Sequence, residues 1–189
     1  MKQNGFTLVE ILVAMAIMAI VGVILVLIFT NTLRGSSKSQ ILSVIKQNGQ
    51  SVLENMDKTI RNSDNVVCVG TPTKNTIVVV KNSVYTRYRI VDGYISVDNP
   101  TPGASETTPP PFINRVCNSN DPMPLARILT DTNTQTGVRV ENGSFSLSTL
   151  PGFKTAVTID FLLRAGVDVN QSIAGQIDPI EFKTTIGLR

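Results

Sequence analysis

The sequence contains no histidine and no tryptophan, and aromatic residues make up only 5% of its 189 residues. Without histidine the chain lacks the usual general base, the commonest metal ligand and every Ser-His or Cys-His nucleophile pair. The shortage of aromatic rings leaves little material for platforms that stack nucleic-acid bases. We therefore expect a protein that is not an enzyme, with no catalytic residues, no metal site and no cofactor.

Charge is also scarce, because charged residues are 16% of the chain while hydrophobic residues are 42%. Such a composition predicts that the apolar residues are concentrated in one part of the sequence. The formal net charge of +3 is well short of the basic stripe that nucleic-acid-binding proteins carry. Net charge alone therefore does not support a nucleic-acid partner.

The apolar residues gather near the N-terminus, where residues 11–29 form an unbroken hydrophobic run. Counted from Phe6 the stretch has about 24 residues, which makes a helix roughly 36 Å long and sufficient to cross a membrane. Glu10 is the one charge in that stretch. A carboxylate inside such a helix costs about 2.5–3.5 kcal/mol on insertion scales and usually has a partner. A cleaved secretory signal would have a shorter apolar core, and a plain membrane anchor would leave Glu10 unexplained.

A third alternative explains Glu10. The segment Gly5-Phe6-Thr7-Leu8-Val9-Glu10 before a long apolar helix resembles the class III signal of type IV pilins and type II secretion pseudopilins. The resemblance covers residues 1–30 and implies that a membrane peptidase cuts after Gly5. It also implies N-methylation of the new N-terminal residue, Phe6. The implied partners are the prepilin peptidase/methyltransferase, other pilin subunits, and an inner-membrane assembly platform with its ATPase.

Cleavage after Gly5 would also give Glu10 a partner. It would create a cationic α-amino group on Phe6, and helices bundled with an axial offset would bring that amine to Glu10 of the next subunit. Pairing offsets much of the penalty of burying either charge, so the pair would favour one stagger between copies. The alternative is that Glu10 lies near the lipid headgroups and is solvated there.

After residue 30 the helix is expected to continue as an amphipathic segment over residues 31–62. Apolar residues recur there at helical spacing on one face, and the face comprises Ile41, Ile45, Val52, Met56 and Ile60, widened by Val44 and Leu53. The sequence therefore divides into a leader (1–5), a membrane or filament-core helix (6–30), its amphipathic continuation (31–62) and a head (63–189). Gly22, Gly35 and Gly49 interrupt the helix, either as points of bending or as sites of close packing.

The head is expected to be β-rich, so that the fold is α+β and pilin-like, with the second half of the helix packed against antiparallel strands. Residues 76–80, 84–91 and 94–97 predict a three-stranded meander whose second turn is Asp92-Gly93. A second hairpin is predicted around Asn142-Gly143, joining residues 138–140 to 145–147. Further strands are expected at 155–163 and 180–188, and residues 98–111 are expected to form a proline-rich loop.

Two cysteines, Cys68 and Cys117, lie beyond the membrane helix. They either form a disulfide or remain buried thiols, and a location outside the cytoplasm favours the disulfide. The disulfide would close a loop of about fifty residues and stabilise the head by ~4 kcal/mol in the chain-entropy model. Two sulfur atoms without histidine are too few ligands for zinc.

Together these features predict a structural subunit of a type IV pilus-like filament, made as a prepilin and held in the inner membrane before assembly. The head would lie outside the cytoplasm, and the mature protein would belong to a cell-surface or periplasmic filament. One alternative is a minor pseudopilin of type II secretion, because residues 182–189 are similar to the last strand of larger minor pilins and J-type pseudopilins. Another is a DNA-binding tip pilin, if the head arginines cluster: Arg87, Arg89, Arg115, Arg127 and Arg139.

Overall fold

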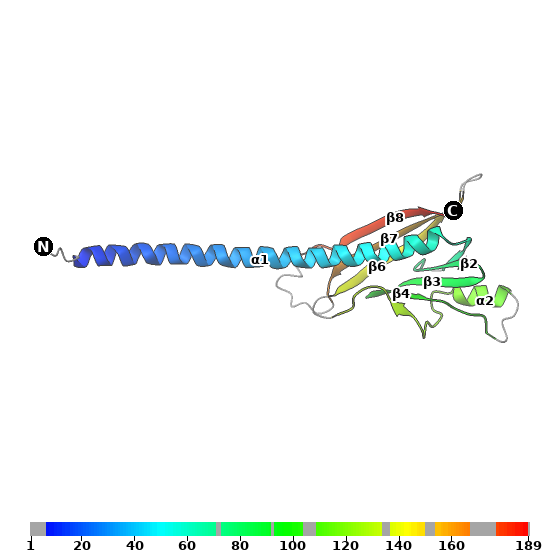
Figure 1. Ribbon diagram of the computed structural model, residues 1–189. Coiled ribbons are helices and arrows are strands. Elements are labelled where there is room, and N and C mark those ends of the chain that lie inside the picture. Colours follow the sequence, from blue (N-terminus) through cyan, green and yellow to red (C-terminus); the bar gives the residue numbers. More distant parts are fainter. Residues whose placement is uncertain are drawn as a thin grey trace. The chain divides into compact units, whose positions relative to one another are not determined.

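A computed structural model describes residues 7–70, 73–91, 93–103, 109–133, 137–149, 154–166 and 177–188. The chain divides into two compact units, Met1–Gln40 and Ile41–Arg189, and each is described by itself. The elements in chain order (Figure 1) are α1 (Leu8–Arg61), β1 (Asn65–Val69), β2 (Thr76–Lys81), β3 (Val84–Val91), β4 (Tyr94–Asp98), α2 (Pro109–Val116), β5 (Arg127–Ile128), β6 (Val138–Ser148), β7 (Ala156–Ala165) and β8 (Ile180–Gly187).

Helix α1 is continuous over its 54 residues and ends at Arg61, where the sequence predicts its end. Ser63 follows this end, and both its backbone N–H and its hydroxyl donate to the Ile60 carbonyl, at 3.1 and 2.6 Å. These bonds satisfy one of the carbonyls that a helix leaves unpaired at its C-terminus. The amphipathic face is also as predicted, because Ile45, Val52, Met56 and Ile60 are buried.

The first sheet has the order β1-β2-β3-β4-β5, with every neighbouring pair antiparallel. Strands β2 to β4 are the predicted meander. Strands β2 and β3 are joined by Asn82 and Ser83, both with positive φ, as a type I′ turn requires. Strands β3 and β4 pair from Val91↔Tyr94, and the Asp92 of the predicted turn lies outside the described residues. The two edge strands, β1 and β5, were not predicted.

The second sheet has the order β6-β7-β8 and is also antiparallel. Here the predicted hairpin around Asn142-Gly143 is wrong, because residues 138–148 form one strand that pairs with β7 along its length. A bulge between Val140 and Asn142 shifts the register by one residue, and the pairing then continues to Ser148. Gly143 serves packing, since a Cβ there would lie 2.9 Å from Ile90 and from Phe161.

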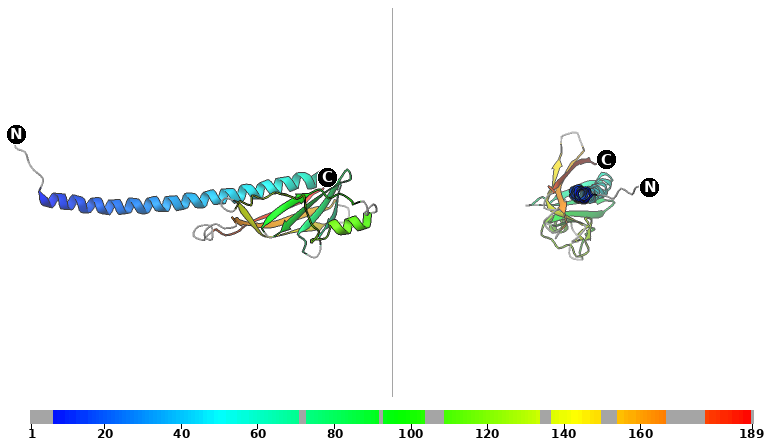
Figure 2. Two further views of the ribbon diagram at one scale, coloured as in Figure 1. Left: turned by 90° about the horizontal axis from the view of Figure 1, so that it is seen from below. Right: turned by 90° about the vertical axis from the view of Figure 1, so that its left-hand side faces the viewer.

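Both sheets contribute to the core that covers the C-terminal part of α1 (Figure 2). Buried residues from β2, β3, β4, β6, β7 and β8 form one cluster with Ile45, Val52, Met56 and Ile60. Gly49 marks a close approach, because a Cβ at this position would overlap the Phe182 ring of β8. The α+β, pilin-like architecture expected from the sequence is therefore confirmed, and Gly49 is a site of close packing.

Helix α2 corrects the predicted loop at residues 98–111, because the helix begins at Pro109. Proline is tolerated in the first turn of a helix, where backbone N–H groups have no intrahelical acceptor. Phe112 and Val116, one turn apart, are buried against Val78 in a second apolar cluster. The Phe112 ring meets the Tyr85 ring edge to face at 4.9 Å.

Candidate functional site

The described chain begins at the N-terminus of α1, where Thr7 and Glu10 form a reciprocal cap. The Thr7 backbone N–H donates to Glu10 Oε2 at 2.9 Å, and the Glu10 N–H donates to Thr7 Oγ1 at 3.3 Å. The Thr7 hydroxyl also donates to Glu10 Oε2 at 3.1 Å. Thr-x-x-Glu is the capping-box pattern, which satisfies two of the unpaired donors of a helix start. Glu10 therefore stabilises its own helix within a single chain.

Two of the predicted processing residues, Gly5 and Phe6, lie outside the described residues. The position of the Phe6 amine relative to Glu10 of another copy is therefore a matter for proposal. Gly5 and Phe6 directly precede the capping box in the sequence, so cleavage between them would leave both Thr7 and Glu10 in the mature chain.

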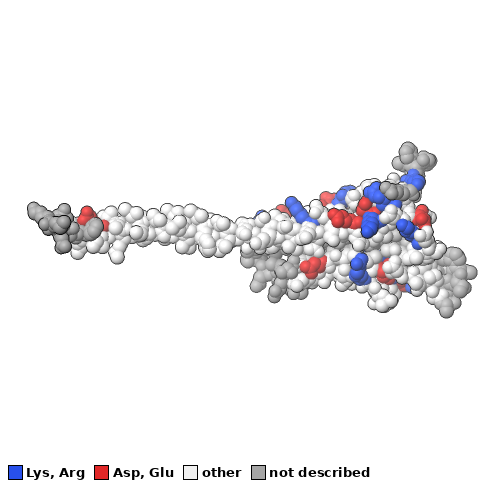
Figure 3. All heavy atoms as spheres, viewed as in Figure 1, with Lys and Arg blue, Asp and Glu red and all other residues white. Residues whose placement is uncertain are grey.

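The unit Met1–Gln40 presents a long uncharged apolar surface. No charged residue occurs between Glu10 and Arg34 (Figure 3), and the helix contains an 18-residue window of mean hydropathy 3.3 with none of it buried within the chain. Leu8, Met18 and Val26 are 75%, 77% and 65% exposed. By length and composition α1 can cross a membrane, which agrees with membrane anchoring through this helix.

The first polar side chains after this surface bind back to their own helix. The hydroxyl groups of Thr30 and Thr32 donate to the carbonyls of Val26 and Ile28 at 2.8 and 2.9 Å. Ser37 makes the same bond to Leu33 at 3.1 Å. Such i−4 bonds let hydroxyl side chains lie in an apolar environment without an unsatisfied donor.

The two cysteines of the head connect a strand of the first sheet to the end of α2. The sulfur atoms of Cys68, in β1, and Cys117, directly after α2, are bonded in the structure, with Cα atoms 6.1 Å apart. That separation lies within the normal range for a disulfide. Both residues pack against the Phe112–Val116 cluster, so the bond links α2 to the edge of the first sheet.

Three of the head arginines converge on Asp121, which follows the end of α2, two through its carboxylate and one through its backbone carbonyl. Arg87 in β3 is 1% exposed and makes a bidentate pair with Asp98 of β4, at 2.9 and 2.6 Å. Its other terminal nitrogen donates to Asp121 Oδ2 at 2.5 Å. Arg115, on α2, approaches the same Asp121 oxygen at 3.5 Å. The segment after α2 is therefore held to the first sheet by the Arg87–Asp121 ion pair as well as by the disulfide.

Arg89, two residues after Arg87 on the same face of β3, completes this network. It is 6% exposed and donates to the backbone carbonyls of Asp121 and Asn118 and to the Thr76 hydroxyl. Because buried charges need partners, each of these bonds offsets part of the cost of excluding water from the guanidinium.

The two buried arginines differ in the direction of their pKa shifts. Burial alone would lower the pKa of Arg87, but its hydrogen bonds to the Asp98 and Asp121 carboxylates outweigh burial and raise that pKa. Burial lowers the pKa of Arg89, and the neighbouring charge of Arg87 adds to this effect. Both groups nevertheless remain cationic at neutral pH, because the unperturbed arginine pKa lies far above 7.

These contacts remove the main support for a DNA-binding surface. Arg87 and Arg89 are buried and are engaged within the protein. Arg127 is exposed, and Arg139 is partly buried with an interaction of its own. The sequence left open whether these arginines cluster, and it did not predict the acids that pair with Arg87 and Arg115.

Sequence reasoning thus missed two features of this site. The first is the capping box, which has a recognisable sequence signal in the Thr-x-x-Glu spacing at residues 7–10. The ion network has no comparable signal, because Arg87, Asp98 and Asp121 are brought together by strand register and by the position of α2. Within the described residues, no group of three or more His, Cys, Asp or Glu is placed to hold a metal ion.

Comparison with known proteins gives one match. Residues 1–26 match the prokaryotic N-terminal methylation motif, which is the prepilin signal of type IV pilins and pseudopilins. No curated protein and no solved structure matches the chain. This motif supports a precursor of the pilin-like or pseudopilin type, and it implies processing by a prepilin peptidase and assembly with other pilins. The protein type that carries this motif is structural rather than enzymatic.

Proposed function

We propose that this protein is a structural subunit of a type IV pilus-like filament, cleaved after Gly5 and N-methylated on Phe6. The observation that carries the proposal is the uncharged apolar surface of α1 directly behind the methylation motif. Before assembly the surface lies in lipid, with the head outside the cytoplasm. In the filament, neighbouring copies of the same helix cover it. No reaction is assigned to the chain, since its role is to pack.

Glu10 sets the stagger between copies in this proposal. In the single chain its carboxylate is held by Thr7, which reduces the cost of placing it at the membrane edge. After cleavage the Phe6 amine of a neighbouring copy offers it a full positive charge. Because each charge alone is costly to bury in an apolar bundle and pairing offsets much of that cost, the favoured stagger is the one that brings the two charges together.

Cleavage is tested by replacing Gly5 with a bulky residue such as leucine. The expected result is a full-length precursor that remains in the membrane fraction, with no filaments, because the amine on Phe6 is never released. Intact-mass measurement of the membrane protein decides the matter. A wild-type mature mass from the Gly5→Leu variant would contradict the assigned cleavage site.

The role of Glu10 is separated from helix capping by two matched variants. Glu10→Gln keeps a capping-box side chain but removes the negative charge, whereas Thr7→Val removes the capping hydroxyl and keeps the charge. If Glu10 pairs with the Phe6 amine, Glu10→Gln is inserted and cleaved but does not assemble, and Thr7→Val still forms filaments. The reverse result would show that Glu10 acts only as a cap.

Secretion pseudopilins carry the same motif at their N-terminus, and they assemble beneath the outer membrane. Immunogold labelling of the head distinguishes the two fates. Label along fibres outside the cell is expected for a pilus subunit, whereas label confined to the periplasm would assign the chain to a secretion system.

A further inference from the structure

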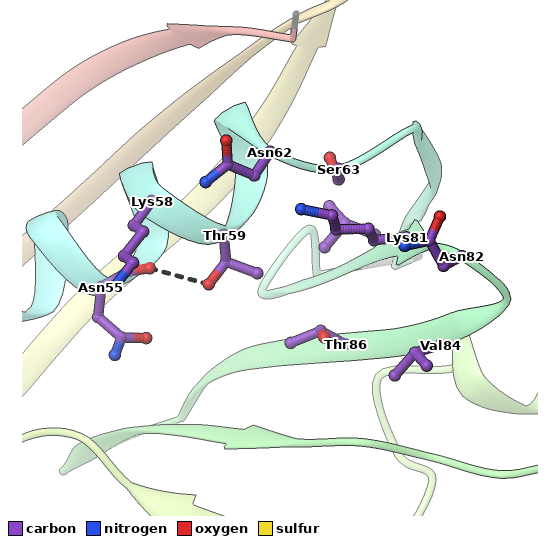
Figure 4. Close-up of a pocket in the computed structure, with 10 residues that line it drawn as sticks. Asn55, Lys58, Thr59, Asn62, Ser63, Lys81, Asn82, Val84 and Thr86 are labelled. Carbon is purple, nitrogen blue, oxygen red and sulfur yellow. Dashed lines mark hydrogen bonds between the residues drawn. The ribbon is translucent and has the colours of Figure 1, made fainter.

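The head contains a pocket that filament assembly does not explain. It lies where the C-terminal end of α1 meets the turn between β2 and β3, entirely within the unit Ile41–Arg189 (Figure 4). Its volume of about 550 Å³ is within the range of about 300–1,000 Å³ that is usual for small-molecule sites. The residues that line it are Asn55, Lys58, Thr59, Asn62, Ser63, Val79, Lys81, Asn82, Val84 and Thr86.

The lining carries two positive charges and no negative one. Lys58 comes from the last turn of α1 and Lys81 from the end of β2. Across the described part of the chain, neither ammonium group is paired with a carboxylate. Of the neighbouring acids, Asp57 binds Arg61 at 2.6 Å. Asp64 lies beside the pocket, where it accepts the backbone N–H of the lining residue Asn82 at 2.8 Å. Both ammonium groups are therefore available to a ligand, with Asp64 as the one carboxylate bonded to the pocket lining.

The remaining polar groups suit a ligand rich in hydroxyls. The Asn55 amide oxygen accepts the Tyr88 hydroxyl at 3.1 Å, which fixes the side chain and leaves its NH₂ group as a donor. The Thr59 hydroxyl donates to the Asn55 carbonyl at 3.0 Å, so its oxygen still accepts. Asn62 and Thr86 add further amide and hydroxyl groups around the same space (Figure 4).

No aromatic ring lines the pocket. Nucleic-acid bases are usually held by stacking on aromatic side chains, and this pocket has no surface for such stacking. Its apolar wall is supplied by Val79 and Val84. Recognition must then depend on ion pairing and hydrogen bonds, which requires a ligand with a negative charge and several hydroxyl groups.

We propose that this pocket binds an acidic sugar, a saccharide unit that carries a carboxylate. Lys58 and Lys81 hold the carboxylate, and the asparagine and threonine side chains bind the hydroxyl groups. The filament would thereby carry a binding site for uronic-acid polymers on each head. The site belongs to the head alone, so it stands whether or not the filament assignment is correct.

Lysines near a helix C-terminus also have a plain structural role, because they complement the negative end of the helix dipole. Lys58 is in that position. Lys81 is not part of the helix. Figure 4 shows it extending from β2 toward the end of α1, and both lysines line the pocket. A purely structural role therefore predicts a change in stability on replacing Lys58 and no ligand for the pair.

The test uses the full chain in micelles of an uncharged detergent that contains no sugar. Saturation-transfer NMR is recorded with digalacturonate and, separately, with the neutral disaccharide of galactose. We expect transfer to digalacturonate only. The double variant Lys58→Met, Lys81→Met should lose affinity about tenfold or more, with an unchanged tyrosine near-UV circular dichroism spectrum. Lys46→Met, an exposed lysine on the same helix outside the pocket, should bind as the wild type does.

Several outcomes would overturn the proposal. These are no transfer from digalacturonate at millimolar concentration, equal transfer from the neutral disaccharide, or binding that survives the double variant. Displacement of the sugar by an equal concentration of inorganic sulfate would show a site for simple anions. Salt-sensitive binding of an oligonucleotide that the same variant abolishes would assign the pocket to nucleic acid instead.

Discussion

The two units of this chain use apolar residues in opposite ways. In the head they alternate along strands or recur on one helix face, and the resulting core is closed within the chain. In the first unit they surround the helix, and its most hydrophobic window has no buried share at all. The division falls within α1 itself, since all the buried residues of that helix lie at or beyond Ile45. The head thus supplies its own cover, whereas the first unit needs cover from lipid or from other copies.

Removing the apolar run of the first unit is the strongest way to test this contrast. A chain that starts at residue 31 keeps the buried face of α1 and loses the apolar run. We expect it to be a soluble, cooperatively folding monomer, whereas the full chain needs detergent. Size-exclusion chromatography and thermal unfolding measure both properties. An aggregated or unfolded fragment would show that the head depends on the first unit.

Within the head, the largest effect of a single substitution is expected at Arg87. Arg87→Met leaves Asp98 and Asp121 buried without their main cation, and breaking a buried pair in this way costs about 3–5 kcal/mol. The free energy of unfolding can be followed by tyrosine circular dichroism, because Tyr85, Tyr88 and Tyr94 all lie in the head. The matched control is Arg61→Met, at an exposed pair with Asp57, where little or no loss of stability is expected because water screens the pair.

The disulfide should rank next. Replacing both Cys68 and Cys117 by serine releases a constraint across 49 residues of sequence, for which the chain-entropy model gives about 4 kcal/mol and measured losses are often smaller. Urea unfolding with and without reductant gives the value. Peptide mapping without reductant should recover the two cysteines as one linked pair, and free thiols in protein taken from cells would remove this contribution.

The smallest changes in stability are expected at two glycines of α1, Gly49 and Gly35, and they should have opposite signs. A Cβ on Gly49 would overlap the Phe182 ring, whereas a Cβ on Gly35 meets nothing within 4 Å. Gly49→Ala is therefore expected to destabilise the head by about 1–3 kcal/mol through overpacking. Gly35→Ala should instead favour the helix by about 0.5–1 kcal/mol. Thermal unfolding of both variants checks the signs, and equal signs would mean that the two units are not separate in the way described.

The sequence alone predicted the parts of the fold that have strong periodicity. Helix α1 was predicted from a membrane-length run followed by an apolar face, and strands β2 to β4, β7 and β8 from β-branched runs between turns. Asn142-Gly143 misled the prediction because the same dipeptide that favours a hairpin also suits a strand where a neighbouring side chain, here Ile90, lies too close for a Cβ. Packing against another element decided the matter, and local sequence does not contain that information.

The same reason explains what was missed in the candidate site. The processing signal is local and was therefore readable from residues 1–26. The ion network joins residues 87, 98 and 121, whose meeting depends on the register Arg87↔Asp98 between β3 and β4 and on the path of the chain after α2. Strand β5 was missed for a different reason, because its two residues are too few to form a periodic pattern in the sequence.

The double fastening of α2 has a consequence for how the surface of this protein can vary. Asp98 is tied to β3 by its ion pair, and the far end of α2 is tied by Cys117 to β1. The chain between residues 98 and 109 therefore has an anchor on each side that does not depend on its own sequence. We therefore expect insertions between these two anchors to be tolerated better than insertions within the strands of the sheet, and a foreign peptide placed there should leave the disulfide and the Arg87–Asp98 pair in place.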